Sequence, residues 1–459
     1  MNIIVNNLGP IKQANFDFDK KISVFCGPNN TGKTYLSYVL YAFTRQRIYA
    51  MEESLTDAQL DDFLVKRSFL LPINPEKIYE IMSNRQFTVP GDMAAIFALS
   101  DNVAEKLFAN FKMQVSMDKD AYLSYLKERE IDSKIGYKGQ SLVKMTKKSG
   151  DLKLHIQNIS NRTDISREAI KGELLNQIYK IIAFPVFFSH FFPVERTSLY
   201  TYYKDILSNR SKLMELLQRL DNGNRQALVD YISGNSARYP MAIAYSLDAA
   251  NTMSLVSQDR GYYASLADDI EKVILRGKIS LTEDGDMKYT SSRVPEKEIP
   301  LYLSASMTKS MSGLVHCLRH VAGRYDMIFI DEPEVNLHPD AQIWAARIFG
   351  KMVNAGIRLV ISTHSDYIIR ELNNLIMYYN IEESSKKRFS EMGYTHDMGL
   401  DQNYVGAYFF KSGKQGEVNV ESLPVTETGF EVPTIDDVIT RLNKASEELY
   451  YSLKYGDNE

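Results

Sequence analysis

The sequence predicts an α/β fold whose core is divided along the chain by a long, largely helical insertion. Three observations lead to this prediction. Residues 22–43 read as a buried strand, a glycine-rich loop and a helix. Residues 327–330 form a continuous apolar run, which is typical of a parallel strand buried on both faces. Between them, from about residue 50, apolar residues such as Val103 and Leu107 recur at the spacing of short amphipathic helices.

Composition narrows the class of protein. The chain has 459 residues, of which 44% are hydrophobic and 24% charged, as in ordinary globular proteins. The net charge of −4 gives no general basic field for binding nucleic acid. Two cysteines, Cys26 and Cys317, cannot build a disulfide framework or a metal clip. We find no signal peptide and no apolar run of about 20 residues, so we expect a cytoplasmic protein without membrane contact.

The glycine-rich loop matches the P-loop pattern G-x-x-x-x-G-K-S/T and lies between the predicted strand and helix, as the pattern requires. Backbone N–H groups of such a loop, together with the helix N-terminus, hold a phosphate chain. Lys33 is expected to reach the β- and γ-phosphates, and Thr34 to ligate Mg²⁺. The sequence therefore predicts binding of ATP with Mg²⁺. The expected nucleotide contacts in the loop are Gly27, Asn29, Asn30, Thr31, Gly32, Lys33 and Thr34.

Two acids follow the apolar strand at 327–330. Asp331 is at the Walker B position, where a carboxylate holds Mg²⁺ through water, and Glu332 is placed to polarise an attacking water. The alternative is a strand that merely ends in solvated acids. Because a P-loop occurs in the same chain, we favour hydrolysis of the bound nucleotide.

Other elements follow from local patterns. Residues 2–25 read as two or three strands, and alternating runs predict hairpins at 138–158 and 278–290. A second helical block is expected at about 203–275. The C-terminal part is expected to contain a helix at 339–353, a strand at 359–362, a helix at 366–377, strands at 404–411 and 417–422, and a helix at 434–453.

The segment 331–339 reads DEPEVNLHP and resembles the DEPE-x-x-LHP segment of ABC-type ATPases of the OLD, RecF and SMC-like group, often catalogued as AAA family ATPases. Residues 7–11, 27–30 and 361–365 resemble the same group. The resemblance covers the head and leaves most of residues 50–300 unexplained. It implies an ABC-type P-loop ATPase head with a mixed sheet, interrupted by the helical insertion.

The resemblance also implies roles for single residues. Glu332 would be the catalytic base, His364 the switch histidine that senses the γ-phosphate, and residues 336–339 the D-loop facing a partner head. Ser304 or Ser306 would be the signature serine that acts on the opposite subunit, although the segment lacks the usual glycine pair and a helix-capping serine cluster is the alternative. Arg196, in a P-x-E-R segment, would contact phosphate or the insertion, or else form a surface salt bridge.

Four regions are expected: an N-terminal lobe with the P-loop at 1–50, a mainly helical insertion with β-hairpins at 51–295, part of which returns to the head, a C-terminal lobe with the signature, Walker B and switch histidine at 296–380, and C-terminal strands and a helix at 381–459. The strands around residues 405–410 are a candidate docking edge for a partner.

The resemblance extends to the stand-alone ATPase subunits of two-gene anti-phage systems such as PARIS and Septu. It implies slow, assembly-coupled turnover in a homodimer or higher oligomer of ATP-sandwiched heads that controls a separately encoded, nuclease-like effector. DNA or a phage protein would be a further partner. The alternative is a RecF-like repair or recombination ATPase that binds DNA directly.

Overall fold

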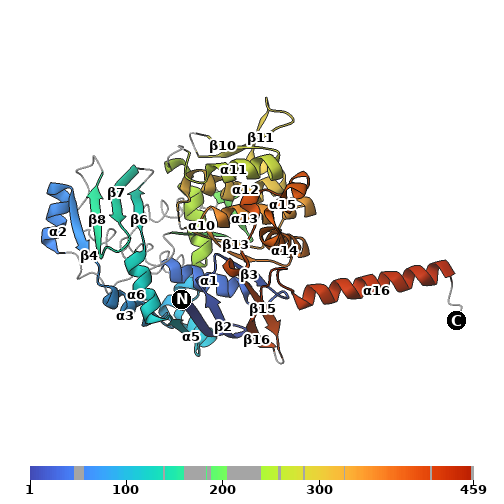
Figure 1. Ribbon diagram of the computed structural model, residues 1–459, viewed down its shortest axis with the longest axis horizontal. Coiled ribbons are helices and arrows are strands. Elements are labelled where there is room, and N and C mark those ends of the chain that lie inside the picture. Colours follow the sequence, from blue (N-terminus) through green and yellow to red (C-terminus); the bar gives the residue numbers. More distant parts are fainter. Residues whose placement is uncertain are drawn as a thin grey trace, which may run out of the picture.

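The chain folds around one mixed sheet, shown in the computed structural model of Figure 1. Among the described residues, this sheet has nine strands in the order β5-β1-β2-β16-β15-β3-β14-β13-β9. The strands are β1 Asn2–Leu8, β2 Ile11–Asp17, β3 Ile22–Cys26, β5 Lys112–Ser116, β9 Ser189–Phe192, β13 Met327–Asp331, β14 Arg358–Ser362, β15 Val405–Ser412 and β16 Val418–Leu423. The structure describes residues 1–45, 56–137, 140–159, 182, 188–203, 239–256, 260–282, 285–324, 326–413 and 416–455.

One half of the sheet is parallel. Strands β15, β3, β14, β13 and β9 all run in one direction, so their carboxyl ends meet at one edge. Every residue of β3 and β13 is buried, as in parallel strands covered on both faces. Helix α1 (Lys33–Arg45) packs on β9, β13 and β14, while α13 (Pro339–Asn354) packs on β14 and on α14 (Asp366–Asn380). The P-loop and both predicted acids therefore lie at the same edge of the sheet.

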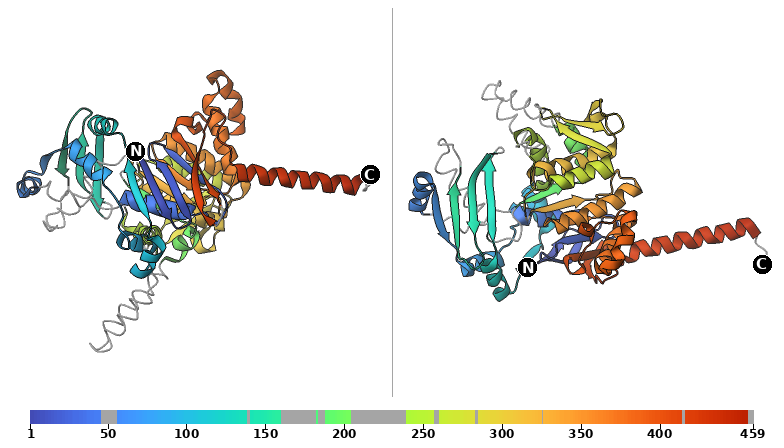
Figure 2. Two further views of the ribbon diagram at one scale, coloured as in Figure 1. Left: turned by 90° about the horizontal axis from the view of Figure 1, so that it is seen from below. Right: turned by 45° about the horizontal axis from the view of Figure 1, so that its top comes forward.

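The insertion contains a sheet of its own and also returns to the core. Strands β4 (Ser68–Pro72), β8 (Lys153–Asn158), β7 (Gln140–Lys147) and β6 (Ile131–Tyr137) form an antiparallel sheet in that order, which stands beside the core in both views of Figure 2. Strands β5 and β9, also from this part of the chain, add to the two edges of the core sheet. The helices here are α2 Asp57–Asp61, α3 Pro75–Ser83, α4 Gly91–Phe97, α5 Asp101–Phe108, α6 Lys119–Glu128, α10 Met241–Asn251 and α11 Ala264–Ile270, and a π-helix covers Asp62–Lys66.

A small sheet and a helix lead from the insertion back to the parallel strands of the core sheet. Strands β10 (Gly277–Leu281), β11 (Met287–Ser291) and β12 (Glu298–Pro300) form an antiparallel sheet. Helix α12 (Ser306–His316) follows, and a π-helix continues it over Cys317–Val321. A π-helix also continues α11 over Glu271–Leu275. Helix α12 therefore reaches the core just before β13.

The C-terminal strands correct one prediction. Strands β15 and β16 lie inside the core sheet, with β3 on one side and β2 on the other. The first six residues of β15 are buried, so the interpretation of residues 405–410 as a docking edge is wrong. Short helical turns precede β15, namely α15 (Glu383–Lys386) and 3₁₀ segments at Lys387–Met392, His396–Met398 and Gln402–Tyr404.

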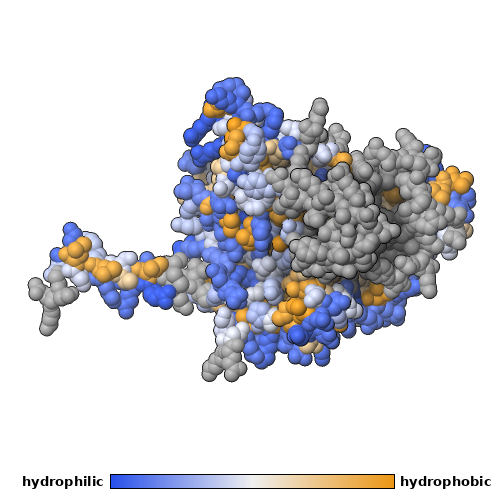
Figure 3. All heavy atoms as spheres, turned by 180° about the vertical axis from the view of Figure 1, so that it is seen from behind, coloured by the Kyte–Doolittle hydropathy of each residue, from blue (hydrophilic) through white to orange (hydrophobic). Residues whose placement is uncertain are grey.

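The last helix, α16 (Pro433–Tyr455), points away from the head in Figure 1. Apolar side chains lie exposed along it, as Figure 3 shows from behind. They include Leu442, Leu449 and Leu453. None of the helices among the described residues is long and apolar enough to cross a membrane.

The predicted hairpins and the order of C-terminal elements are confirmed, with β7–β8 and β10–β11 pairing antiparallel. Much of the second helical block lies outside the described residues, since 204–238 and 257–259 are not described. The same holds for residues 138, 139, 283 and 284 of the hairpin segments.

Candidate active site

The P-loop connects β3 to α1, and two glycines determine its path. Gly27 and Gly32 have φ angles of 138° and 91°, in a region that side chains with a Cβ rarely adopt. A Cβ on Gly27 would lie 2.7 Å from the Phe410 carbonyl oxygen, and one on Gly32 would lie 2.9 Å from the Ile11 side chain. The loop therefore packs closely on both β15 and the β1–β2 corner.

The tip of the loop is open to solvent. Asn29 and Asn30 are exposed, and Asn30 has a φ of 62°. Thr31 is buried, and its hydroxyl donates to the Pro28 carbonyl at 2.8 Å. Helix α1 begins at Lys33, and the first N–H groups of a helix have no partner within it. The loop and the helix start thus present backbone donors for an anion.

Lys33 lies under the loop with its ammonium group among backbone carbonyls. Its Nζ donates to the oxygens of Gly27 at 3.0 Å and Pro28 at 2.8 Å, and the residue is 6% exposed. Burial lowers the pKa of Lys33, while the charges of Glu332 and Asp331 act to raise it. Charged acceptors form stronger hydrogen bonds than neutral carbonyls, so these two contacts are weaker than bonds from the same ammonium group to an anion.

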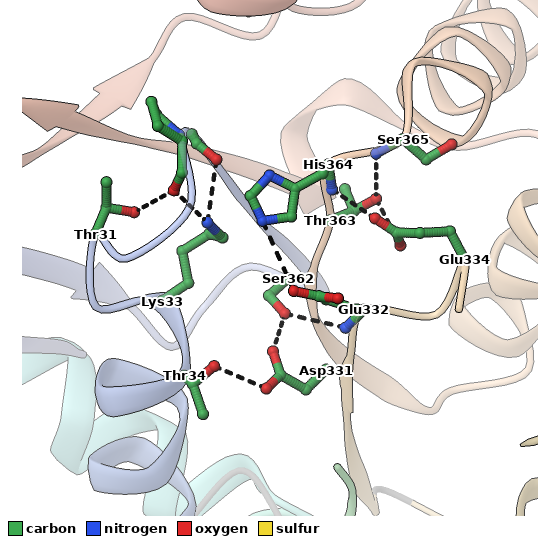
Figure 4. Close-up of polar contacts among 12 residues, drawn as sticks. Thr31, Lys33, Thr34, Asp331, Glu332, Glu334, Ser362, Thr363, His364 and Ser365 are labelled. Atoms are coloured by element: carbon green, nitrogen blue, oxygen red, sulfur yellow. Dashed lines mark hydrogen bonds and ion pairs between the residues drawn. The ribbon is translucent and has the colours of Figure 1, made fainter. Parts of the chain in front are cut away.

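The Walker B strand meets the P-loop helix through a direct side-chain contact. The Thr34 hydroxyl donates to Asp331 Oδ2 at 2.8 Å (Figure 4). Asp331 is 4% exposed, and its other oxygen accepts a hydrogen bond from the Ser362 hydroxyl at the end of β14. Sequence reasoning missed Ser362, because its partner lies 31 positions away and no local pattern marks the pair. Three neighbouring elements therefore fix the predicted metal-binding carboxylate.

Glu332 adopts a backbone conformation that is unusual for its residue type, with a φ of 46°. The left-handed region costs such a residue about 1–2 kcal/mol, so its surroundings must hold it there. The Glu332 N–H donates to the Ser362 carbonyl at 3.0 Å. Burial and the nearby Asp331 raise the pKa of Glu332, while Lys33 acts to lower it. A raised pKa suits a carboxylate that accepts a proton.

His364 faces Glu332 across the site. Its Nε2 lies 3.8 Å from Glu332 Oε1. Burial, and secondly the charge of Lys33, lowers the pKa of His364 to about 4. The imidazole is therefore neutral near pH 7, and its contact with Glu332 is polar and not an ion pair. Figure 4 shows both side chains turned toward the opening between the P-loop and the Walker B tip.

Glu334 holds the loop that carries His364, a role that no local sequence pattern indicated. Its carboxylate accepts from the His364 N–H at 2.6 Å and from the Thr363 hydroxyl at 2.9 Å. Burial is the main cause that raises the pKa of Glu334. Ser365 then caps α14, since its hydroxyl accepts from the Ile368 N–H at 3.1 Å. The carboxylate thus connects the Walker B loop directly to the histidine loop.

The structure corrects one of the interpretations offered for Arg196, the surface salt bridge. Only 2% of the residue is exposed, so it forms no surface salt bridge. Its guanidinium donates to the carbonyl oxygens of Asp331 at 2.7 Å and Glu332 at 2.8 Å. Arg196 therefore supports the backbone that carries the Walker B acids.

The two candidate signature serines differ in exposure. Ser304 is buried, and its hydroxyl donates to the Leu301 carbonyl at 2.6 Å. Ser306 is exposed and is the first residue of α12. Among the described hydrogen bonds, neither serine contacts the P-loop of its own chain.

Comparison with protein families decides which family these motifs represent. A family model described as an AAA ATPase domain matches residues 1–369, a range that includes the P-loop, the Walker B tip and the histidine loop. The chain belongs to this AAA ATPase family. Its fold is that of an ABC-type P-loop ATPase head with a mixed sheet. No curated protein matches the sequence.

Three solved structures resemble the AAA ATPase weakly. The Smc head bound to the C-winged helix domain of ScpA has 10% identity and a TM-score of 0.34, covering 93% of this chain and 98% of that chain. The Smc head with an extended coiled coil bound to the C-terminal domain of ScpA from Pyrococcus furiosus has 9% identity and a TM-score of 0.34, covering 97% and 98%. The SMC head domain from Thermotoga maritima has 8% identity and a TM-score of 0.31, covering 92% and 98%.

The oxygen atoms of Thr34 and Asp331 fit the chemistry of Mg²⁺. Thr34 and Asp331 place a hydroxyl and a carboxylate oxygen 2.8 Å apart beside the phosphate cradle. Mg²⁺ in phosphate-transfer sites takes one or two protein oxygens and completes its shell with water and phosphate. The described residues contain no cluster of three or more His, Cys, Asp or Glu able to hold a metal alone. Bound there, Mg²⁺ would neutralise phosphate charge.

Proposed function

We propose that this ATPase binds ATP with Mg²⁺ through Lys33, Thr34 and Asp331, and hydrolyses it at a site completed by a second copy of the chain. Glu332 acts as the base that orients and activates water, and His364 contacts the γ-phosphate. The observation that carries the proposal is the convergence of these five side chains at one edge of the sheet. Glu332 is half-buried beside a neutral imidazole, which suits the handling of a proton.

Pairing of two heads is supported by exposed residues near the start of α12. Tyr302 and Leu303 are 54% and 65% exposed, and Ser306 follows them in the chain at the exposed helix start. Exposed apolar side chains beside polar ones are typical of interaction sites. We assign the signature role to Ser306, because the Ser304 hydroxyl is already used within its own chain.

The paired heads, in this proposal, form the sensor and scaffold subunit of a two-component anti-phage complex that controls a separately encoded, nuclease-like effector. Slow turnover coupled to assembly would then time the release of that effector. The exposed apolar residues of α16 support a role in binding a second protein, since the helix leaves the head and offers them to solvent.

The first test measures pairing by light scattering. Glu332→Gln with ATP and Mg²⁺ is expected to run at twice the mass of the chain, and to return to the monomer mass when Ser306→Arg is added, because a bulky cation replaces a small contact residue. Ser384→Arg, on an exposed turn, is the matched control and leaves pairing unchanged. A monomer in Glu332→Gln at saturating ATP contradicts the composite site.

The second test concerns the effector. The product of a neighbouring gene is expected to co-purify with the full chain, and this binding is expected to weaken at least about tenfold, or about 1.4 kcal/mol, when Leu442, Leu449 and Leu453 of α16 are replaced by serine. Phage-challenged cells carrying both genes should survive better than cells carrying the variant. Equal binding and equal protection by the variant would exclude α16 as the docking element.

A further inference from the structure

Arg196 is a buried cation whose partners, among the described hydrogen bonds, are neutral. Its three guanidinium nitrogens donate four hydrogen bonds, to the Ser310 hydroxyl at 2.9 Å, the Pro193 carbonyl at 3.1 Å, and the carbonyls of Asp331 and Glu332. Burial lowers the pKa of Arg196 to about 10, so the group remains charged at neutral pH. A rigid planar group with several fixed donors holds separate chain segments in one relative position.

One of these segments is the left-handed turn at Glu332. Its N–H is held by Ser362, and its carbonyl is held by Arg196, so both sides of the residue are fixed. The direction of the Glu332 side chain depends on this backbone conformation. Displacement of the guanidinium would allow Glu332 to relax and turn its carboxylate away from the phosphate end of the site.

The other segment is helix α12. Ser310 accepts from Arg196 Nε, and its hydroxyl also lies 3.3 Å from the Val335 carbonyl in the loop after Glu332. Ser310 is four residues, about one helical turn, beyond Ser306. A second hydrogen bond joins the loop after Glu332 to the residue that follows Arg196: the Asn336 amide donates to the Thr197 hydroxyl at 3.2 Å. Movement of the exposed end of α12 is thus communicated to the Glu332 backbone through one buried side chain.

We infer that Arg196 is a positioning residue that couples the two functional ends of each head. It holds Glu332 at that head's own nucleotide and ties it to the α12 end, which contacts the nucleotide of the partner head. The assignment of α12 to the partner's nucleotide rests on the proposed function. The link between Arg196, Ser310 and Glu332 lies within one chain and is independent of the proposed function.

The decisive experiment is hydrogen–deuterium exchange of the full chain with and without ATP and Mg²⁺. In the wild type, nucleotide is expected to slow exchange at residues 306–316. Arg196→Lys keeps the positive charge but loses the planar guanidinium group. In this variant the slowing at residues 306–316 is expected to disappear, while nucleotide still slows exchange in the P-loop. Ser310→Ala should act in the same direction. Retained slowing in both variants would overturn the coupling.

Steady-state kinetics provide the second readout. In Arg196→Lys, kcat is expected to fall about 10- to 100-fold with KM for ATP changed less than about threefold, as for the loss of a group that orients a reactive side chain. Arg347→Lys is the matched control, because Arg347 is also buried and pairs with Glu371 on α14, away from the site residues. An equal kcat loss in both variants would show that Arg196 has only a general structural role.

The two hypotheses fail in different ways. A wild type that stays monomeric or hydrolyses no ATP would count against the proposed function, yet the exchange experiment would still decide the coupling, since it needs only nucleotide binding.

A Ser310→Ala and Arg196→Lys double variant should lose no more kcat than the stronger single variant, because both act through one contact chain. Full additivity would show that the two residues act separately.

Discussion

Lys33→Ala is expected to weaken ATP binding by at least about 100-fold. The ammonium group now contacts two neutral carbonyls and would exchange them for phosphate oxygens. Hydrogen bonds to charged groups contribute about 1.5–3 kcal/mol each, and about 1.4 kcal/mol corresponds to a tenfold change in affinity, so two such bonds account for the effect. Isothermal titration of the full chain with ATP and Mg²⁺ measures it.

The control for this prediction is Lys12→Ala. Lys12 is an exposed residue that pairs with Glu417, so its removal should leave ATP affinity within about twofold of the wild type, as for most surface ion pairs. Circular dichroism should show both variants folded. A Lys33→Ala chain that binds ATP as tightly as Lys12→Ala would contradict the phosphate role of Lys33.

Glu332→Gln is expected to lower kcat by about 10²- to 10⁴-fold while ATP binding is kept, because a general base contributes on this scale and glutamine cannot accept a proton. Phosphate release by the full chain at saturating ATP measures kcat. Glu421→Gln is the matched control, since Glu421 pairs with Lys411 at an exposed position on β16. Turnover by Glu332→Gln within tenfold of the control would assign the base elsewhere.

The rate of ATP hydrolysis is also expected to depend on pH through Glu332. The base must be deprotonated, and burial raises the pKa of Glu332. The rate is therefore lost as the pH falls through a value above the ordinary range for glutamate, and it is fully present above that value. His364, with a pKa of about 4, stays neutral through this range and adds no second limb there. A wild-type rate unchanged down to about pH 4 would contradict this assignment.

Motifs that are continuous in the sequence could be predicted, and contacts between distant residues could not. The P-loop and the Walker B acids each lie at a strand end with the expected neighbours, so their placement followed from local patterns. Arg196 meets Asp331 from 135 positions away, and nothing near Arg196 in the sequence marks those carbonyl acceptors. The segment resemblance identified Arg196 as close to the site without showing which way it points.

The spacing of apolar residues predicts a helix without predicting which of its side chains are buried. Val103 and Leu107 have helical spacing, but they are 43% and 57% exposed, while Ala104 and Phe108 of α5 are buried. Spacing predicts a helix and leaves open which face meets the core. The segment 405–410 was interpreted as a docking edge, but all six of its residues are buried because β15 lies inside the sheet.

The position of β15 and β16 has a consequence for how the ATPase is made. Strand β3, which leads into the P-loop, pairs on one side with β15, and Gly27 packs against Phe410. Gly27 and Phe410 lie about 383 positions apart in the sequence. During synthesis the N-terminal strands emerge long before the strand that must be placed beside them. The P-loop therefore reaches its final packing only after the chain has been synthesised through β15.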